Sequence, residues 1–204
     1  MESISSFTDL IIEQFRHTSW PEWLGVITGF ACIYLAAKEK VLSWPVSVIS
    51  VLAYAWVFYD ATMYGDMVLQ FYFLFTAFYG WFYWNKTTEA HSKPVISMQR
   101  GQWTIAILTI VLLSALLGLF LDHFTNSDVP YADGFCTAVS FAAQFLLTRK
   151  VLQNWILWIL VDICYIPLYI YKNLNLSAVF YAFLVIIAFR GYIDWKKTYA
   201  HQAR

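Results

Sequence analysis

The residues best suited to chemistry in this chain lie in the stretch NWILWILVD, residues 154–162, within a longer apolar run. Trp155, Trp158 and Asp162 are spaced three and four residues apart, so they share one face of a helix, and Tyr165 continues that face. Two indole rings and a carboxylate suit a flat aromatic cation, because each ring contributes about 0.5–2 kcal/mol of cation–π attraction. The pattern predicts a binding site for a small cationic molecule.

Each of these residues also has a structural interpretation. Asp162 lies near the middle of an apolar helix, where a charge costs about 2.5–3.5 kcal/mol, and this favours a binding or transport role over a packing role. Trp155 begins the helix and also suits the aromatic belt at a membrane interface, whereas Trp158 lies one turn deeper.

Other polar residues interrupt apolar segments. Gln144 is a ligand contact or, alternatively, an interhelical hydrogen-bonding group. Asn154 is explained about as well by helix capping, and Gln70 is a weaker candidate. The predicted substrate-binding residues are therefore Trp155, Trp158, Asp162 and Gln144, with Asn154, Tyr165 and Gln70 as weaker candidates.

Catalytic and metal-binding motifs such as HExxH, GxSxG and the Walker loop are absent from the sequence. We therefore expect no enzymatic activity, no cofactor and no metal site. The formal net charge is zero, which argues against a nucleic-acid partner.

The composition is that of a membrane protein. Of the 204 residues, 60% are hydrophobic and 13% are charged, against about 25% charged in soluble domains. A membrane helix needs about 20 apolar residues. Seven stretches qualify or nearly qualify: 23–37, 41–59, 67–84, 103–121, 134–148, 152–171 and 176–193.

The distribution of charge orients these stretches. Most of the 13 Lys and Arg residues lie in alternate connecting segments and in the C-terminal tail, whereas Arg16 and Lys172 lie in the others. By the positive-inside rule, we expect an odd number of spans, with the N-terminus outside and the C-terminus in the cytoplasm.

The chain contains an internal duplication. A shift of 111 residues aligns AFYGWFYWNK (77–86) with AFRGYIDWKK (188–197), and it also pairs Trp44 with Trp155 and Lys38 with Arg149. We therefore predict an all-α integral membrane protein of seven helices, in which two parallel three-helix repeats flank a connector helix. The predicted segments are 1–21 (an amphipathic segment outside the membrane), 22–86 (first repeat), 87–132 (linker and connector helix), 133–197 (second repeat) and 198–204 (cytoplasmic tail).

Two segments carry a family resemblance. TRKVLQNWILWILVDICYIPLYIYKNL, with its WxxWxxxD core, resembles the signature of the PnuC-type vitamin transporters, chiefly nicotinamide riboside transporters. FYDATMYGDMVLQFYFLFTAFYGWFYW resembles another region of the same family, and the likeness extends from about residue 22 to residue 197.

The resemblance implies a bacterial inner-membrane protein with a 3+1+3 helix arrangement like that of the SWEET transporters. It also implies a homotrimer and facilitated diffusion of the vitamin, which feeds NAD synthesis. It places the ligand-stacking residues on Trp155 and Trp158, the polar motif residue on Asp162 and the helix-5 glutamine on Gln144. Asp162 departs from those members of the family that carry Asn at this position, and thiamine, also a cation, is the alternative ligand. A membrane subunit that binds a ligand without transporting it is a further alternative.

Overall fold

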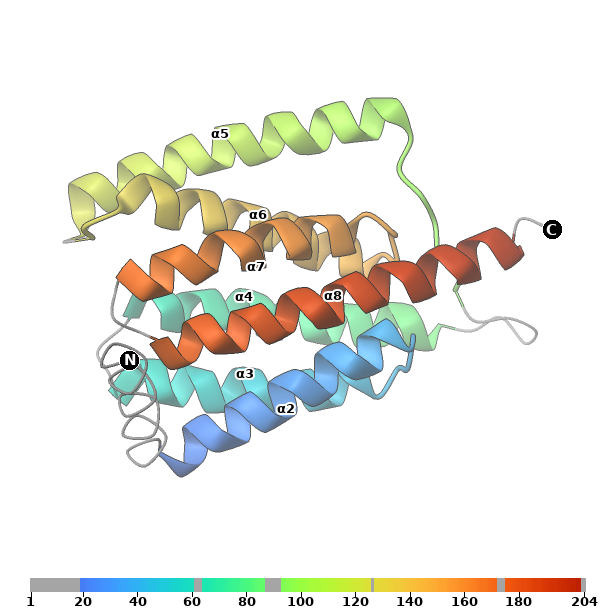
Figure 1. The fold of residues 1–204 in the computed structure, drawn as a ribbon, viewed down its shortest axis with the longest axis horizontal. Helices are drawn as coiled ribbons and strands as arrows, with labels where there is room; N and C mark the ends of the chain where they lie inside the picture. Colours follow the sequence, from blue (N-terminus) through green and yellow to red (C-terminus); the bar gives the residue numbers. More distant parts are fainter. Residues whose placement is uncertain (1–18, 61–63, 87–92, 126, 172–174, 203–204) are drawn as a thin grey trace, which may run out of the picture.

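The computed structural model describes residues 19–60, 64–86, 93–125, 127–171 and 175–202, and these form seven α-helices (Figure 1). Each predicted span falls on one helix, and most of the predicted segment 1–21 lies outside the described residues. The helices are α2 (Trp20–Ala37), α3 (Ser43–Asp60), α4 (Tyr64–Asn85), α5 (Arg100–Phe124), α6 (Pro130–Thr148), α7 (Asn154–Tyr171) and α8 (Asn175–Gln202).

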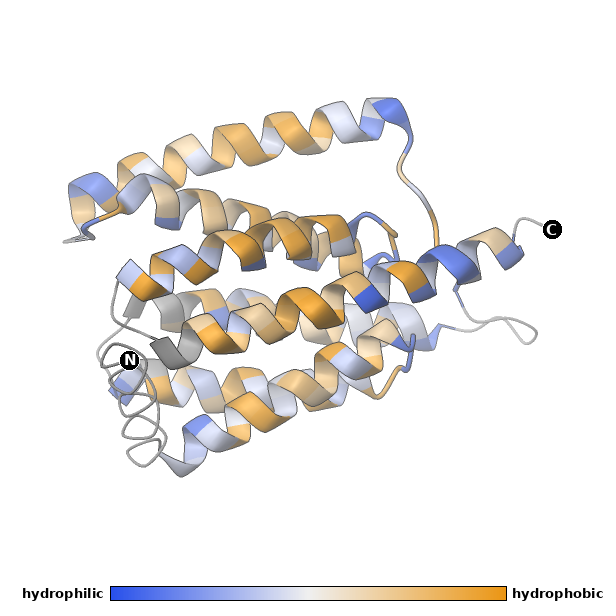
Figure 2. Cartoon of the chain, viewed as in Figure 1, coloured by the Kyte–Doolittle hydropathy of each residue, from blue (hydrophilic) through white to orange (hydrophobic). Residues whose placement is uncertain are grey.

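The chain is an all-α integral membrane protein. Within the described residues, α2, α5, α7 and the Ala178–Gln202 part of α8 are long and apolar enough to cross a membrane, and α3 has a shorter apolar stretch, Ser43–Val57. In Figure 2 the hydrophilic residues gather toward the helix ends, most clearly along the C-terminal part of α8. This helix runs past the predicted end of its span at residue 193, because its polar last turns continue the same helix beyond the apolar part.

Six of the helices form a closed ring. In the order α2, α3, α4, α6, α7 and α8, each contacts the next, and α8 contacts α2. Among the described helices, α5 packs on α6 alone and lies outside the ring (Figure 1). The first helix of each repeat thus contacts the third helix of the other repeat, α2 with α8 and α6 with α4. Two equivalent interfaces therefore join the repeats, as a pseudo-two-fold axis through the ring requires.

The α2–α3 and α6–α7 connections have the same backbone geometry. Glu39 and Lys150 occupy equivalent positions and adopt left-handed φ values of 54° and 55°, the only non-glycine residues described that do so. Such a residue ends a helix in a Schellman turn. Both hydrogen bonds of this turn recur: Glu39 N to Ala36 O and Lys40 N to Leu35 O at 2.9 Å each, and Lys150 N to Leu147 O at 3.0 Å and Val151 N to Leu146 O at 2.9 Å.

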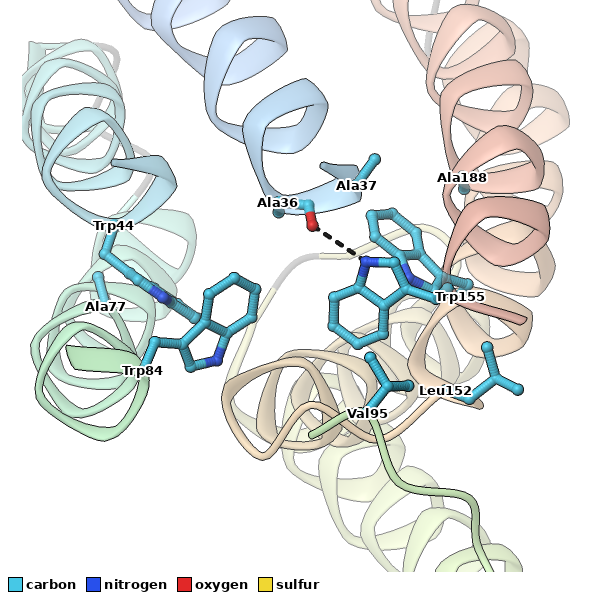
Figure 3. Packing of buried hydrophobic residues seen from close by; sticks show 10 residues of the cluster. Ala36, Ala37, Trp44, Ala77, Trp84, Val95, Leu152, Trp155 and Ala188 are labelled. Atoms are coloured by element: carbon cyan, nitrogen blue, oxygen red, sulfur yellow. Dashed lines mark hydrogen bonds between the residues drawn. The ribbon is translucent and has the colours of Figure 1, made fainter. Parts of the chain in front are cut away.

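A tryptophan and a glycine pack the second helix of each repeat against the third. A Cβ added at Gly80 would lie 2.4 Å from the Trp44 ring, and one added at Gly191 would lie 2.8 Å from the Trp155 ring. Only glycine allows such an approach. Each of these indoles also meets another tryptophan edge to face. The ring centroids of Trp44 and Trp84 lie 5.2 Å apart (Figure 3), and those of Trp155 and Trp195 lie 5.5 Å apart.

Trp84 and Trp195, the third-helix tryptophans of these two pairs, each hydrogen-bond to the other repeat. Trp195 Nε1 donates a hydrogen bond of 3.1 Å to the Ala36 carbonyl at the end of α2, drawn as a dashed line in Figure 3. Trp84 Nε1 donates one of 3.0 Å to the Thr148 carbonyl at the end of α6. Each first helix is therefore held at its basic end by the third helix of the opposite repeat.

Charged contacts at the same end differ between the repeats. Lys38 donates to the Asp194 carboxylate at 2.7 Å, and this hydrogen bond and the negative charge raise the pKa of Lys38. Its equivalent, Arg149, instead donates to the Tyr79 hydroxyl at 2.8 Å and lies 5.0 Å from the Tyr83 ring centroid. Tyr83 is the equivalent of Asp194. The cation at the end of α2 therefore forms an ion pair with the opposite repeat, whereas the cation at the end of α6 forms a cation–π contact.

The segment before α5 is tied to the α6–α7 turn. Ile96 N donates to Lys150 O at 3.0 Å, and Leu152 N donates to Ile96 O at 2.8 Å, which makes a short parallel bridge. The Gln153 side chain accepts from Met98 N and donates to Ser97 Oγ. These bonds anchor the start of α5 at the basic end of the ring.

Candidate ligand-binding site

The predicted stripe lies on α7, which the ring holds between α6 and α8. Trp155 and Asp162 are buried. Trp158 is half-buried and packs against two groups of buried residues, one that includes Trp155 and Trp195 and one that includes Val139 and Val161. The apolar sequence of α7 forms the helix, and its face toward the neighbouring helices carries these side chains. The helix therefore directs the stripe into the bundle.

Asp162 has the environment of a ligand-binding group. It is 3% exposed, and its Oδ1 has no hydrogen-bond partner among the residues that the structure describes. A buried acceptor left without a partner costs about 1–3 kcal/mol. This oxygen is therefore available to a donor or a cation on a bound molecule.

Three tyrosines form an aromatic cluster next to Asp162, which we call the tyrosine cluster: Tyr165 and Tyr169 of α7 and Tyr181 of α8. Their ring centroids lie 4.8 to 5.4 Å apart. Tyr181 hydrogen-bonds with Tyr169 and interacts electrostatically with Asp162. The structure thus combines a buried carboxylate with aromatic rings from two helices, which is the chemistry that recognises a flat cation.

Tyr181 was missed by the sequence analysis. Nothing about an isolated tyrosine in an apolar helix marks it as a binding residue, and its helix is not the one that carries the stripe. The duplication contains a signal, because the 111-residue shift places Tyr181 on Gln70, which was a weaker candidate. Gln70 itself is buried in α4, the helix opposite α8 in the ring, so it does not lie next to Tyr181.

Trp155 has packing that the duplication explains. It is 1% exposed, with Gly191 against its ring and Trp195 at its edge. Trp44 has the same surroundings in the first repeat, and Tyr54 is the equivalent of Tyr165, whereas Trp158 and Asp162 fall on Ser47 and Val51. In this conformation the Trp155 ring packs against protein, so the role of Trp155 as a ligand contact stays a prediction. Trp158, whose equivalent is Ser47, is the indole that distinguishes the second repeat.

Gln144 connects the repeats. It is buried in α6, and its Nε2 donates a hydrogen bond of 3.2 Å to Thr76 Oγ1 of α4. The Tyr72 hydroxyl joins the same two helices by donating to the Phe141 carbonyl at 2.9 Å. Gln144 therefore makes the interhelical contact considered as its alternative role, and ligand contact by its carbonyl oxygen stays a prediction.

Asn154 is fully buried at the start of α7. Its Nδ2 donates to Val151 O at 2.7 Å, which caps the turn, while its Oδ1 has no partner among the described residues. Ser43, its equivalent, likewise has a buried hydroxyl with no described partner. Capping accounts for the amide nitrogen of Asn154 and leaves its oxygen available.

The fold defines a class of protein, a multi-pass membrane protein in which two parallel three-helix repeats flank a connector helix. A model of the nicotinamide mononucleotide transporter family matches residues 19–197, and the chain belongs to this family.

Individual relatives agree with this membership. The chain is 26% identical to the nicotinamide riboside transporter PnuC of Escherichia coli, over 87% of this chain and 85% of that protein. It is 25% identical to the riboflavin/roseoflavin transporter RibM of Streptomyces davaonensis, over 88% and 86% of the two chains. The crystal structure of the vitamin B3 transporter PnuC matches with a TM-score of 0.76 and 26% identity, covering 96% of this chain and 90% of that one.

Proposed function

We propose that this protein transports nicotinamide riboside across the bacterial inner membrane by facilitated diffusion, and so supplies NAD synthesis. The observation that carries the proposal is the buried Asp162 carboxylate, beside the tyrosine cluster and one turn from Trp158, with one oxygen that has no partner among the described residues. Nicotinamide riboside contains a pyridinium ring, which is flat, aromatic and positively charged. Family membership and the name of the Escherichia coli relative support the same cargo.

Each candidate residue has a proposed role. Trp158 stacks on the pyridinium ring, and Asp162 supplies the opposite charge or accepts a hydrogen bond from the ribose. Gln144 contacts the carboxamide or the ribose, and Trp155 holds the pyridinium together with Trp158 from the preceding turn. Asn154, Tyr165 and Gln70 are secondary contacts along the same path.

Transport in this proposal is a rocking of the repeats, 22–86 and 133–197, about the site between them. The two equivalent interfaces, α2 with α8 and α4 with α6, are the surfaces that would change. The basic ends of the helices face the cytoplasm and the N-terminus lies outside, as the positive-inside rule predicts. By family resemblance, three copies of the chain assemble into a trimer.

One titration separates the candidate cargoes. Nicotinamide riboside, thiamine and riboflavin are each titrated by calorimetry into one preparation of purified protein, riboflavin being included because of the Streptomyces relative. We expect binding of nicotinamide riboside to be the tightest of the three. Tighter binding of either other vitamin would reject the proposed cargo.

A second experiment separates transport from binding alone. The purified protein is reconstituted into liposomes, and uptake of labelled nicotinamide riboside down its gradient is followed with and without an uncoupler. We expect saturable uptake that the uncoupler leaves unchanged. Tight binding without any uptake would instead favour a ligand-binding membrane subunit.

A further inference from the structure

The connector helix α5 meets α6 closely at one end only. A Cβ added at Gly134 would lie 2.6 Å from the backbone nitrogen of Gly118, so these glycines allow backbone to touch backbone near the α5–α6 connection. Toward the other end the two helices diverge, and the start of α5 lies apart from the end of α6 (Figure 1). The pair therefore has the shape of a V that opens at the basic end of the ring.

The open part of the V is a crevice of about 580 Å³. Its walls are mainly apolar and include Ile105 and Leu113 of α5 and Ala142 and Phe145 of α6. Polar lining residues lie at its wide end, among them Gln102 and Arg149, where the preceding segment crosses from the α6–α7 turn to α5. The crevice is thus a long apolar slot with a polar mouth.

Arg149, at this mouth, shares the Tyr83 ring with a second cation, Lys93. The Arg149 guanidinium carbon lies 5.0 Å from the Tyr83 ring centroid, and Lys93 Nζ lies 5.5 Å from the same centroid. Arg149 is exposed and donates to the Tyr79 hydroxyl, a neutral acceptor. Within the described residues neither cation forms an ion pair, whereas Lys38 and Lys150 both do. Two cations held near one ring raise the local positive potential, and an anion that contacts both of them would lower it.

We propose that the crevice is a binding site for an anionic phospholipid. One acyl chain lies between α5 and α6, and the phosphate lies at Arg149 and Lys93. Basic pockets between helices on the cytoplasmic side recognise anionic headgroups, each cation contributing about a factor of five in affinity. The leaflet follows from the proposed orientation, but binding itself is independent of the cargo and of transport.

Native mass spectrometry of the purified protein tests the headgroup contact. Phosphatidylglycerol and phosphatidylcholine with identical acyl chains are offered in equal amounts. We expect the wild type to retain phosphatidylglycerol preferentially, and Arg149→Gln with Lys93→Gln to weaken that binding by roughly fivefold per charge. Lys196→Gln is the matched control, because Lys196 also lies over a tyrosine ring, Tyr192, away from the crevice. Equal retention of the two lipids by the wild type would overturn the proposal.

Filling the crevice tests the acyl contact without altering charge. Ala142→Phe, or Ala106→Phe from the facing helix, should reduce retention of phosphatidylglycerol while the melting temperature and nicotinamide riboside binding stay unchanged. Having two variants on opposite walls allows a readout if one of them does not fold. A change in oligomeric mass with unchanged lipid retention would make the crevice an interface between copies, and the lipid site would be rejected.

Discussion

Glu39 and Lys150 are each other's equivalents in the duplication, and they form an ion pair with each other, with Lys150 Nζ 3.0 Å from Glu39 Oε2. A contact between equivalent residues lies next to the pseudo-two-fold axis, at the end of the ring where the basic residues gather. The lysine is 3% exposed and the glutamate 19%. The lysine also lies 4.7 Å from the Trp84 ring centroid.

This symmetry predicts the result of a charge swap. Glu39→Lys or Lys150→Glu alone places like charges together in a largely buried position, and we expect a loss of about 3 kcal/mol of stability. The double variant Glu39→Lys with Lys150→Glu should recover most of that loss, because the duplication makes positions 39 and 150 equivalent and the swap restores a pair of opposite charges. Thermal unfolding in detergent measures the stability of all three variants relative to the wild type. A double variant no more stable than the single ones would contradict the equivalence of the two positions.

Trp158 is predicted to carry most of the stacking energy. Trp158→Ala should weaken nicotinamide riboside binding at least tenfold, which is about 1.4 kcal/mol and within the range of a desolvated cation–π contact. Calorimetry on the purified variant measures this directly. Trp56→Ala is the control, because Trp56 is 62% exposed on α3. If the two variants bound equally well, stacking on Trp158 would be wrong.

Asp162 is predicted to act through its charge. Asp162→Asn keeps the size of the side chain and removes the negative charge, so affinity for nicotinamide riboside should fall by roughly tenfold while affinity for uncharged nicotinamide changes little. Asp122→Asn, at an exposed acid on α5, controls for the change of net charge. Equal losses for the charged and uncharged ligands would indicate a hydrogen-bonding role instead.

The two glycine–tryptophan contacts are predicted to be structural. Gly191→Ala and Gly80→Ala force a Cβ against Trp155 and Trp44, and overpacking of this kind costs about 1–3 kcal/mol. Gly101→Ala is the matched control, since nothing lies within 4 Å of its added Cβ and alanine favours a helix. Melting temperatures should fall for the first two variants and hold or rise for the third. A fall limited to one repeat would mean that the two contacts are not energetically equivalent.

Much of the fold follows from the sequence because membrane helices are specified locally. Length and hydropathy place the seven helices, and the duplicated residues, such as Gly80 with Gly191 and Trp44 with Trp155, indicate the repeats. The stripe on α7 likewise follows from helical spacing, since one turn determines which residues share a face. The membrane supplies the remaining constraint, because a backbone in lipid must satisfy its hydrogen bonds within each helix.

The tertiary structure decided what each candidate touches. It placed Trp155 against Gly191 and Trp195, brought Tyr181 to Asp162 from another helix, and paired Gln144 with Thr76. Spacing along one helix contains no information about these neighbours, because they come from segments far away in the chain. The sequence by itself determined the helices, their duplication and the face that carries Asp162. Only the packing of distant helices decided which of those side chains support the protein and which remain available to a ligand.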